Sequence, residues 1–205
     1  MPKDNLYAII LAAGKSSRMS NTPKQLLKWQ NRSLLEHTLH HVRNLFKERI
    51  ILVLGAHHDL ITANLDLNSV NTLINPDWKL GISSSIQAGL KALPADATGA
   101  IIILSDQPLI KDQHFETLVN TWQARPTHIV ASEYHHSVGV PAIFPKQLFA
   151  ELHELKGDQG AKAILLKYAD TLLKVPLPEA ELDIDSPEDF ITLLAHISSK
   201  NRTLQ

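Results

Sequence analysis

Several stretches of the chain are apolar without any alternation between polar and apolar residues. The run Ile50-Ile51-Leu52-Val53-Leu54 is the clearest of them. A strand with one solvated face alternates the two kinds of side chain, so an uninterrupted run predicts a strand that is covered on both faces. On this basis strands are predicted at residues 7–11, 50–54, 70–74, 100–104, 128–131 and 172–175.

Segments with the period of a helix lie between these runs. Apolar residues recur at spacings of three and four along one such segment, at Leu35, Leu39, Val42 and Phe46, and so fall on one helix face. Further helices are predicted at residues 83–93, 112–122, 160–168 and 187–197, the last one starting with a Ser186 cap before Pro187. Alternating strands and helices predict an α/β fold of three αβα layers around a mostly parallel, Rossmann-like sheet.

Length and composition limit the function classes. The 205 residues suit a single domain, expected at residues 1–197, with a polar tail at 198–205 that is expected to fray. A net charge of −1 argues against a nucleic-acid or membrane-surface partner. Cysteine is absent, which excludes disulfides and thiolate chemistry. The N-terminal apolar run is too short to span a bilayer and lacks a signal-peptide layout, so a cytoplasmic location is expected.

A loop of small residues and cations follows the first predicted strand. It reads Leu11-Ala12-Ala13-Gly14-Lys15-Ser16, with Arg18 and Lys24 close behind. Small residues let backbone N–H groups approach a phosphate, and the cations neutralise its charge. The loop is neither a P-loop nor a G-x-G-x-x-G fingerprint. We therefore predict a nucleoside triphosphate site, the alternative being an ordinary strand–turn with surface lysines.

Acidic residues mark two further positions. Asp106 follows the run at 100–104, and ligands of open α/β sheets bind beyond the carboxyl ends of strands. Its carboxylate suits Mg²⁺, although an Asp here could also just cap a turn. Asp183 and Asp185 point to the same side of an extended segment and could approach one cation. A purely structural role at the Ser186 turn is the alternative.

Two more segments are candidate binding loops. Gly81 precedes a hydroxyl-rich helix start with Ser83 and Ser85, where free N–H groups could hold a base or a phosphate. Simple capping by Ser83 is the alternative. Asp158 lies in a glycine-rich turn that could cover an acceptor substrate, or could be a structural loop. The histidine doublets are not predicted to be metal sites, because adjacent side chains face different ways.

Taken in order, these motifs resemble the molybdopterin nucleotidyltransferases of the MobA-like NTP-transferase group. The similarity is greatest to the CTP-using molybdenum cofactor cytidylyltransferase branch. It covers about residues 6–190. The matching motifs are Leu11-Ala12-Ala13-Gly14 with Ser16, Arg18, Met19 and Lys24; Asn75-Pro76-x-Trp78-x-x-Gly81-x-Ser83-x-Ser85-Ile86; Asp106-Gln107-Pro108; Gly139-Val140-Pro141; Gly157-Asp158-x-Gly160-Ala161-Lys162; and Asp183-Ile184-Asp185-Ser186-Pro187-Glu188-Asp189.

The resemblance implies a fold of the nucleotidyltransferase, glycosyltransferase-A-like type and assigns roles to residues. Arg18 and Lys24 would hold the triphosphate, and Asp106 would bind Mg²⁺ with Asp185 or Asp183. Nucleotide and acceptor contacts would come from Leu11, Ala12, Ala13, Gly14, Lys15, Ser16, Gly81, Ser83, Ser85 and Asp158. The terminal phosphate of the acceptor, molybdenum cofactor, would attack the α-phosphorus of CTP and expel pyrophosphate. A recipient molybdoenzyme or its chaperone is a further partner that the resemblance allows.

The choice of base and acceptor stays open at this point. The Cβ of Ala13 would narrow the pocket against a purine, which favours CTP over GTP. A GTP-dependent guanylyltransferase and a sugar-phosphate nucleotidyltransferase of the same fold are the alternatives within the enzyme class. A catalytically inactive nucleotide-binding regulator is the alternative outside it.

Overall fold

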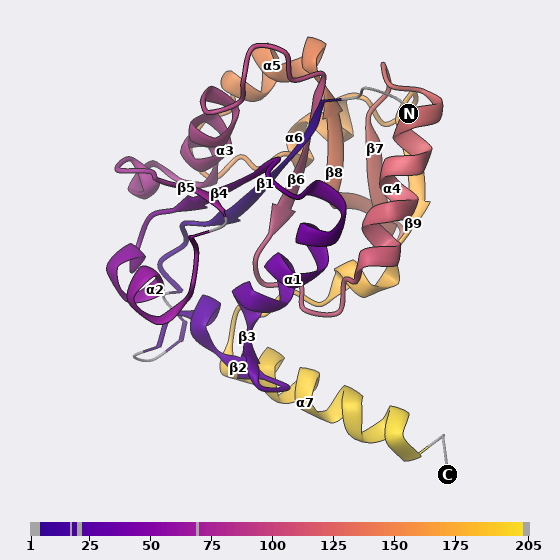
Figure 1. Ribbon diagram of the computed structural model, residues 1–205. Coiled ribbons are helices and arrows are strands. Elements are labelled where there is room, and N and C mark those ends of the chain that lie inside the picture. Colours follow the sequence, from indigo (N-terminus) through magenta and orange to yellow (C-terminus); the bar gives the residue numbers. More distant parts are fainter. Residues whose placement is uncertain (1–4, 17, 20–21, 69, 203–205) are drawn as a thin grey trace.

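The computed structural model describes residues 5–16, 18–19, 22–68 and 70–202, with side chains described through residue 194. Within these residues the framework is a seven-stranded sheet in the order β5-β4-β1-β6-β8-β7-β9 (Figure 1). The strands are β1 (Leu6–Ala12), β4 (Ile50–Leu54), β5 (Asn71–Ile74), β6 (Gly99–Leu104), β7 (Val130–Tyr134), β8 (Ser137–Pro145) and β9 (Leu173–Pro176).

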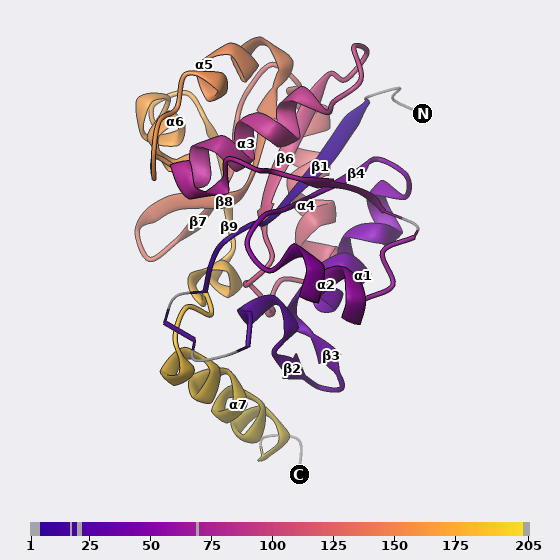
Figure 2. The same cartoon turned by 90° about the vertical axis from the view of Figure 1, so that its left-hand side faces the viewer.

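Helices cover both faces of this sheet, as Figures 1 and 2 show from two sides. One face carries α1 (Leu34–Phe46) and α4 (Asp112–Ala124), and the other carries α3 (Ile82–Lys91), α5 (Phe149–His153) and α6 (Lys162–Lys167). A short helix, α2 (His58–Asn64), links β4 to β5. The prediction of three αβα layers is confirmed.

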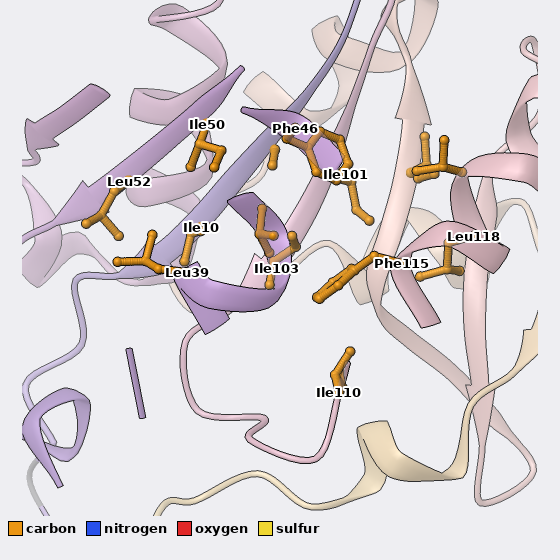
Figure 3. Close-up of a cluster of buried hydrophobic side chains, with 14 of the residues drawn as sticks. Ile10, Leu39, Phe46, Ile50, Leu52, Ile101, Ile103, Ile110, Phe115 and Leu118 are labelled. Atoms are coloured by element: carbon orange, nitrogen blue, oxygen red, sulfur yellow. The ribbon is translucent and has the colours of Figure 1, made fainter. Parts of the chain in front are cut away.

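Residues of the central strand β1 divide between two hydrophobic clusters. Ile10 faces the cluster under α1 and α4, whereas Ile9 and Leu11 face the cluster under α3, α5 and α6. Figure 3 shows the first cluster, in which Ile10 lies among Leu39 of α1, Ile103 of β6 and their neighbours. Ile10 is fully buried, and burial of such a side chain stabilises the fold by about 1.5–3 kcal/mol. Apolar residues on both faces explain why this strand does not alternate.

The sheet is mostly parallel, as predicted. β1 pairs in parallel with β4 and β6, β4 with β5, and β7 with β9. The exception is β8, which runs antiparallel to both β6 and β7. β8 is not predictable from the sequence pattern, because Gly139, Pro141 and Pro145 are residues that normally argue against a strand interior.

The C-terminal helix α7 (Pro187–Arg202) extends away from the sheet (Figure 1). Its start is capped as predicted: Asp189 N donates to Ser186 Oγ, and Ser186 N donates to Asp189 Oδ2 at 2.8 Å. The helix runs past residue 197 to Arg202, and residues 203–205 of the expected polar tail lie outside the described part.

A small satellite cluster connects α7 to the body. It joins α7 to the hairpin of β2 (Lys28–Trp29) and β3 (Arg32–Ser33), and its buried members are Trp29, Leu34, Ile184 and Leu193. The length and apolar character needed to cross a bilayer are not combined in any helix of the described residues.

Candidate functional site

The carboxyl ends of three parallel strands meet where the strand order reverses. From β1 the chain moves outward to β4 and β5 on one side, and β6 then pairs with β1 on the other. Backbone bonds join the loops that follow these strands: Ser105 N donates to Leu11 O at 3.3 Å, and Ala56 N donates to Ala13 O at 3.0 Å. Such a reversal point is the usual ligand crevice of an open α/β sheet.

A cavity of about 420 Å³ opens at this point. It is lined by Leu11, Ala13, Gly14, Lys15, Lys24, Gln25, Trp78, Lys79, Gly81, Ile82, Ser85, Leu104, Ser105, Asp106, Asp158, Asp183 and Asp185. A second cavity of about 280 Å³ shares Gly14, Lys24 and Asp185 with the first and adds Ser16 and Arg18. The first loop therefore forms one wall of a space that suits a ligand of nucleotide size.

Gln25 holds the first loop in place. The side chain is buried, and its Nε2 lies 3.3 Å from Ala12 O and 3.4 Å from Gly14 O. Its Oε1 accepts a hydrogen bond from Ser16 Oγ, which in turn accepts one from Lys24 N at 3.1 Å. Ser16 has φ of 56°, a left-handed conformation that these bonds stabilise. Gln25 thus fixes both the loop and the backbone that carries Lys24.

The ammonium of Lys24 lies between two carboxylates. Nζ donates to Asp106 Oδ2 and, at 2.6 Å, to Asp185 Oδ1. Burial opposes the charged form of Lys24, but the two carboxylates outweigh that effect and raise its pKa above the ordinary value. Asp185 also lies 3.9 Å from the guanidinium of Arg18, whose side chain is 74% exposed. The exposed Arg18 is therefore available to a ligand.

Asp183 is the most perturbed acid of the site. Burial, followed by the charge of Asp106, raises its pKa to about 7. Among the described residues, Asp183 Oδ1 and Asp106 Oδ1 are both buried without a hydrogen-bond partner. Unpartnered carboxylate oxygens are the ligands that Mg²⁺ prefers, so these residues fit a divalent cation.

The carboxylates do not form a finished cage for a metal. In the part of the chain that is described, no three acidic, histidine or cysteine side chains converge as metal ligands. Asp106 and Asp185 instead share the single ammonium of Lys24. This arrangement agrees with the usual habit of Mg²⁺, which takes one or two carboxylates and completes its shell with water and substrate phosphate.

The start of α3 forms the opposite side of the cavity. Gly81 has φ of 97°, and an added Cβ would lie 2.3 Å from the carbonyl of Gly157 and 2.7 Å from Asp158 Oδ1. Only glycine allows the 157–158 segment to rest on the helix start, where Ser83 N donates to Gly157 O at 3.2 Å. Asp158 consequently reaches the cavity.

The family assignment follows from a comparison with known sequences. A model of the MobA-like NTP transferase domain matches residues 8–172. The chain belongs to the MobA-like NTP transferase family. The match does not separate the branches of this family, and it ends before Asp183 and Asp185.

Solved structures and curated relatives agree with this family. Rv0371c of Mycobacterium tuberculosis H37Rv is similar, at 27% identity and a TM-score of 0.82 over 93% of this chain and 97% of that one. A complex of Rv0371C with manganese gives 26% identity and a TM-score of 0.77 over 93% and 98% of the two chains. The bifunctional protein GlmU of Mycobacterium ulcerans is 36% identical over 123 residues, which are 57% of this chain and 25% of GlmU. The chain thus spans about a quarter of the length of such curated relatives.

The cavity brings together most of the residues that the sequence predicted. Ser16 and Arg18 line the smaller cavity beside it, Ser83 is buried and lines neither of the two, and Ala12 is buried in β1. Ser83 is not the cap of α3 either, because Gly81 holds the cap position. Instead, Ser84 Oγ donates to Gly81 O at 2.8 Å, and Ser85 Oγ accepts from Asn75 Nδ2 at 3.1 Å.

Two glutamines and two side chains of the turn before α3 were not predicted as functional residues. Gln25 and Gln107 bond backbone carbonyls, and such bonds leave no trace in a sequence. Trp78 and Lys79 line the cavity. Trp78 and Gln107 both belong to motifs quoted for the family resemblance, and this membership is the signal that could have marked them.

Proposed function

We propose that this chain is a nucleotidyltransferase that transfers CMP from CTP to the terminal phosphate of molybdenum cofactor and releases pyrophosphate. The observation that supports this most strongly is the position of Lys24 between Asp106 and Asp185, at the foot of the first loop. This arrangement places an ammonium that can bind phosphate, and carboxylates that can bind a metal, within one cavity.

The first loop and its cations would bind the triphosphate. Gly14 and Lys15 line the larger cavity, and Arg18 lines the smaller one beside it. Arg18 can grip a phosphate with two parallel hydrogen bonds, whereas Lys24 acts as a point charge. The two residues would therefore orient the triphosphate and neutralise it.

Asp106 with Asp185 or Asp183 would hold Mg²⁺, and the manganese complex of a related protein supports a divalent cation in this family. When bound, the cation would supply positive charge to the triphosphate as the pentavalent transition state forms. Lys24 is paired with both carboxylates in the described structure. It would turn toward the phosphates when substrate and cation neutralise Asp106 and Asp185 in its place.

The transfer itself requires orientation more than covalent help. An oxygen of the acceptor phosphate would form a bond to the α-phosphorus of CTP, and the bond to the bridging oxygen would break on the opposite side. The electron pair leaves with pyrophosphate. Positioning and charge stabilisation account for most catalysis in such reactions, and Asp158 at the cavity rim would orient the acceptor.

A pyrophosphate-release assay tests this proposal. Purified protein is incubated with Mg²⁺, one of CTP, GTP, UTP or ATP, and either molybdenum cofactor or a sugar 1-phosphate. We expect pyrophosphate release with the combination of CTP and molybdenum cofactor and with no other combination. Release with GTP or with a sugar phosphate would overturn the CTP or the cofactor assignment respectively. Nucleotide binding without turnover on any acceptor would favour a regulator.

A further inference from the structure

Gln107 connects three segments that border the candidate site. The side chain follows Asp106 and is almost completely buried. Its Nε2 donates to Ala180 O at 2.9 Å and lies 3.3 Å from Val140 O. One amide group thus links the turn after β6 to β8 and to the 3₁₀ turn η4 (Pro178–Glu181).

A backbone bond strengthens the same connection. Ile184 N donates to Asp106 O at 3.0 Å, so the residue between Asp183 and Asp185 is tied to the residue that carries the third carboxylate. The three carboxylates arrive on two segments that are far apart in the sequence. Their spacing depends on how firmly these two segments are held together.

We propose that Gln107 is a positioning residue that sets the spacing of Asp106 relative to Asp183 and Asp185 for a divalent cation. The inference rests on the proposed function, because that function supplies the reason for a cation at this place. Groups that orient metal ligands, without touching the metal, typically change metal affinity or activity 10- to 100-fold when they are removed.

The chemistry of the amide suits this position. A carboxylate in place of Gln107 would add negative charge beside three acids, and an apolar side chain would leave the buried Ala180 carbonyl without a donor. A neutral side chain with two N–H bonds can bind both carbonyls without changing the charge of the site. A side-chain hydrogen bond from Gln107 to Asp183 also lowers the pKa of Asp183, against the larger effects of burial and of Asp106. Gln107 therefore acts on the Asp183 carboxylate directly as well as through the geometry of the two segments.

Gln87 provides a matched control. Its Nε2 also donates to two backbone carbonyls, those of His153 at 2.9 Å and Leu155 at 2.8 Å, and so ties α3 to the end of α5. Gln107→Met and Gln87→Met each remove two donated bonds at nearly constant side-chain volume. A general loss of stability would lower Tm in both variants, whereas a specific effect on the carboxylates is expected for Gln107→Met alone.

The experiment measures binding of Mn²⁺ alone, by the electron paramagnetic resonance signal of free Mn²⁺, beside Tm and pyrophosphate release. We expect Gln107→Met to lose more Tm than Gln87→Met, because the Gln107 amide is buried and Gln87 is half-buried. Gln107→Met should weaken Mn²⁺ binding by about 10- to 100-fold and lower kcat, whereas Gln87→Met should stay within about 2-fold of the wild type. If Gln107→Met does not fold, Gln107→Asn replaces it, because this variant keeps the amide on a shorter side chain. Gln107→Asn should then weaken Mn²⁺ binding and lower kcat in the same way, but to a smaller extent.

Two outcomes would overturn the inference: equal Mn²⁺ affinities of the Gln107 and Gln87 variants, or no binding of Mn²⁺ by the wild type. Failure of the proposed function looks different. In that case the wild type releases no pyrophosphate with any nucleotide and acceptor, while the loss of Mn²⁺ affinity in Gln107→Met remains measurable and supports the positioning role.

Discussion

The ammonium of Lys24 lies 2.6 Å from Asp185 Oδ1, although 161 positions separate the two residues in the sequence. The same ammonium bonds Asp106. One ammonium therefore pairs with carboxylates from two distant segments. Replacing any member of this group changes the charge that the other members face.

Asp106→Asn is expected to reduce kcat by at least about 10²-fold, since a charge-stabilising group is lost without a change of shape. Lys24 keeps Asp185 as a partner, so the fold should be retained. Pyrophosphate release measures the activity, and circular dichroism with Tm measures the fold. Turnover like that of the wild type at low Mg²⁺ would remove Asp106 from the mechanism.

Lys24→Met is expected to destabilise the substrate-free protein by about 1–3 kcal/mol. Removing one partner of a buried ion pair costs about 3–5 kcal/mol. The cost is smaller here because the Asp185 side chain is 53% exposed, so water partly solvates its unpaired charge. Mg²⁺ should raise the Tm of this variant more than that of the wild type, because it replaces the missing charge.

Lys79→Met is the control for this measurement, since Lys79 lines the cavity without an ion pair in the described residues. It should show no such extra response to Mg²⁺. An equal Mg²⁺ response of the Lys24 variant and the wild type would contradict the prediction.

Ala13→Gly tests how the first loop selects the base. If the loop excludes purines by shape, the wild type prefers CTP, and the glycine variant should narrow that preference by at most about 10- to 200-fold. Turnover of CTP should not rise, because removing the Ala13 methyl gives the pyrimidine no new contact. Values of kcat/KM for CTP and GTP in both proteins decide the matter, and a wild type that prefers GTP would refute the cytidylyl assignment.

Stability should depend on pH through His37. Burial lowers the pKa of this side chain below its ordinary value, so the folded state binds fewer protons than the unfolded state below about pH 6.5. The stability that neutral His37 contributes is therefore fully present above pH 6.5, and it is lost as the pH falls below this value. His37→Gln, which keeps a donor for Trp29 O, should lose less stability than the wild type between pH 7.5 and 5.5.

Comparison of the two proteins isolates the effect of His37. Asp183, with its pKa raised to about 7, contributes with the opposite sign and does so equally in both. Urea denaturation at the two pH values provides the free energies. Identical losses in the two proteins would show that His37 does not control this pH dependence.

The strands that carry the site were predictable, and the way their loops are joined was not. β1, β4 and β6 are long apolar runs because both of their faces are buried, and such runs can be recognised in the sequence. β8 is also largely buried, but its proline and glycine residues are not typical of a strand and prevent its prediction from the sequence. Asp106 and Lys24 were found as candidates, yet no local pattern reveals that they bond each other. Gln25 and Gln107 act on backbone carbonyls, whose positions depend on the complete fold.

The carboxylates of Asp183 and Asp185 come after β9, which ends at Pro176 and is the last strand of the described sheet in chain order. During synthesis, the whole sheet can consequently pair before these two residues have left the ribosome. At that moment Lys24 has only Asp106 as an acidic partner, and the segment that follows β9 is still missing from its place against β6. In this order of emergence, the pairing of Lys24 with Asp185 comes after the strands that hold Lys24 and Asp106 in place.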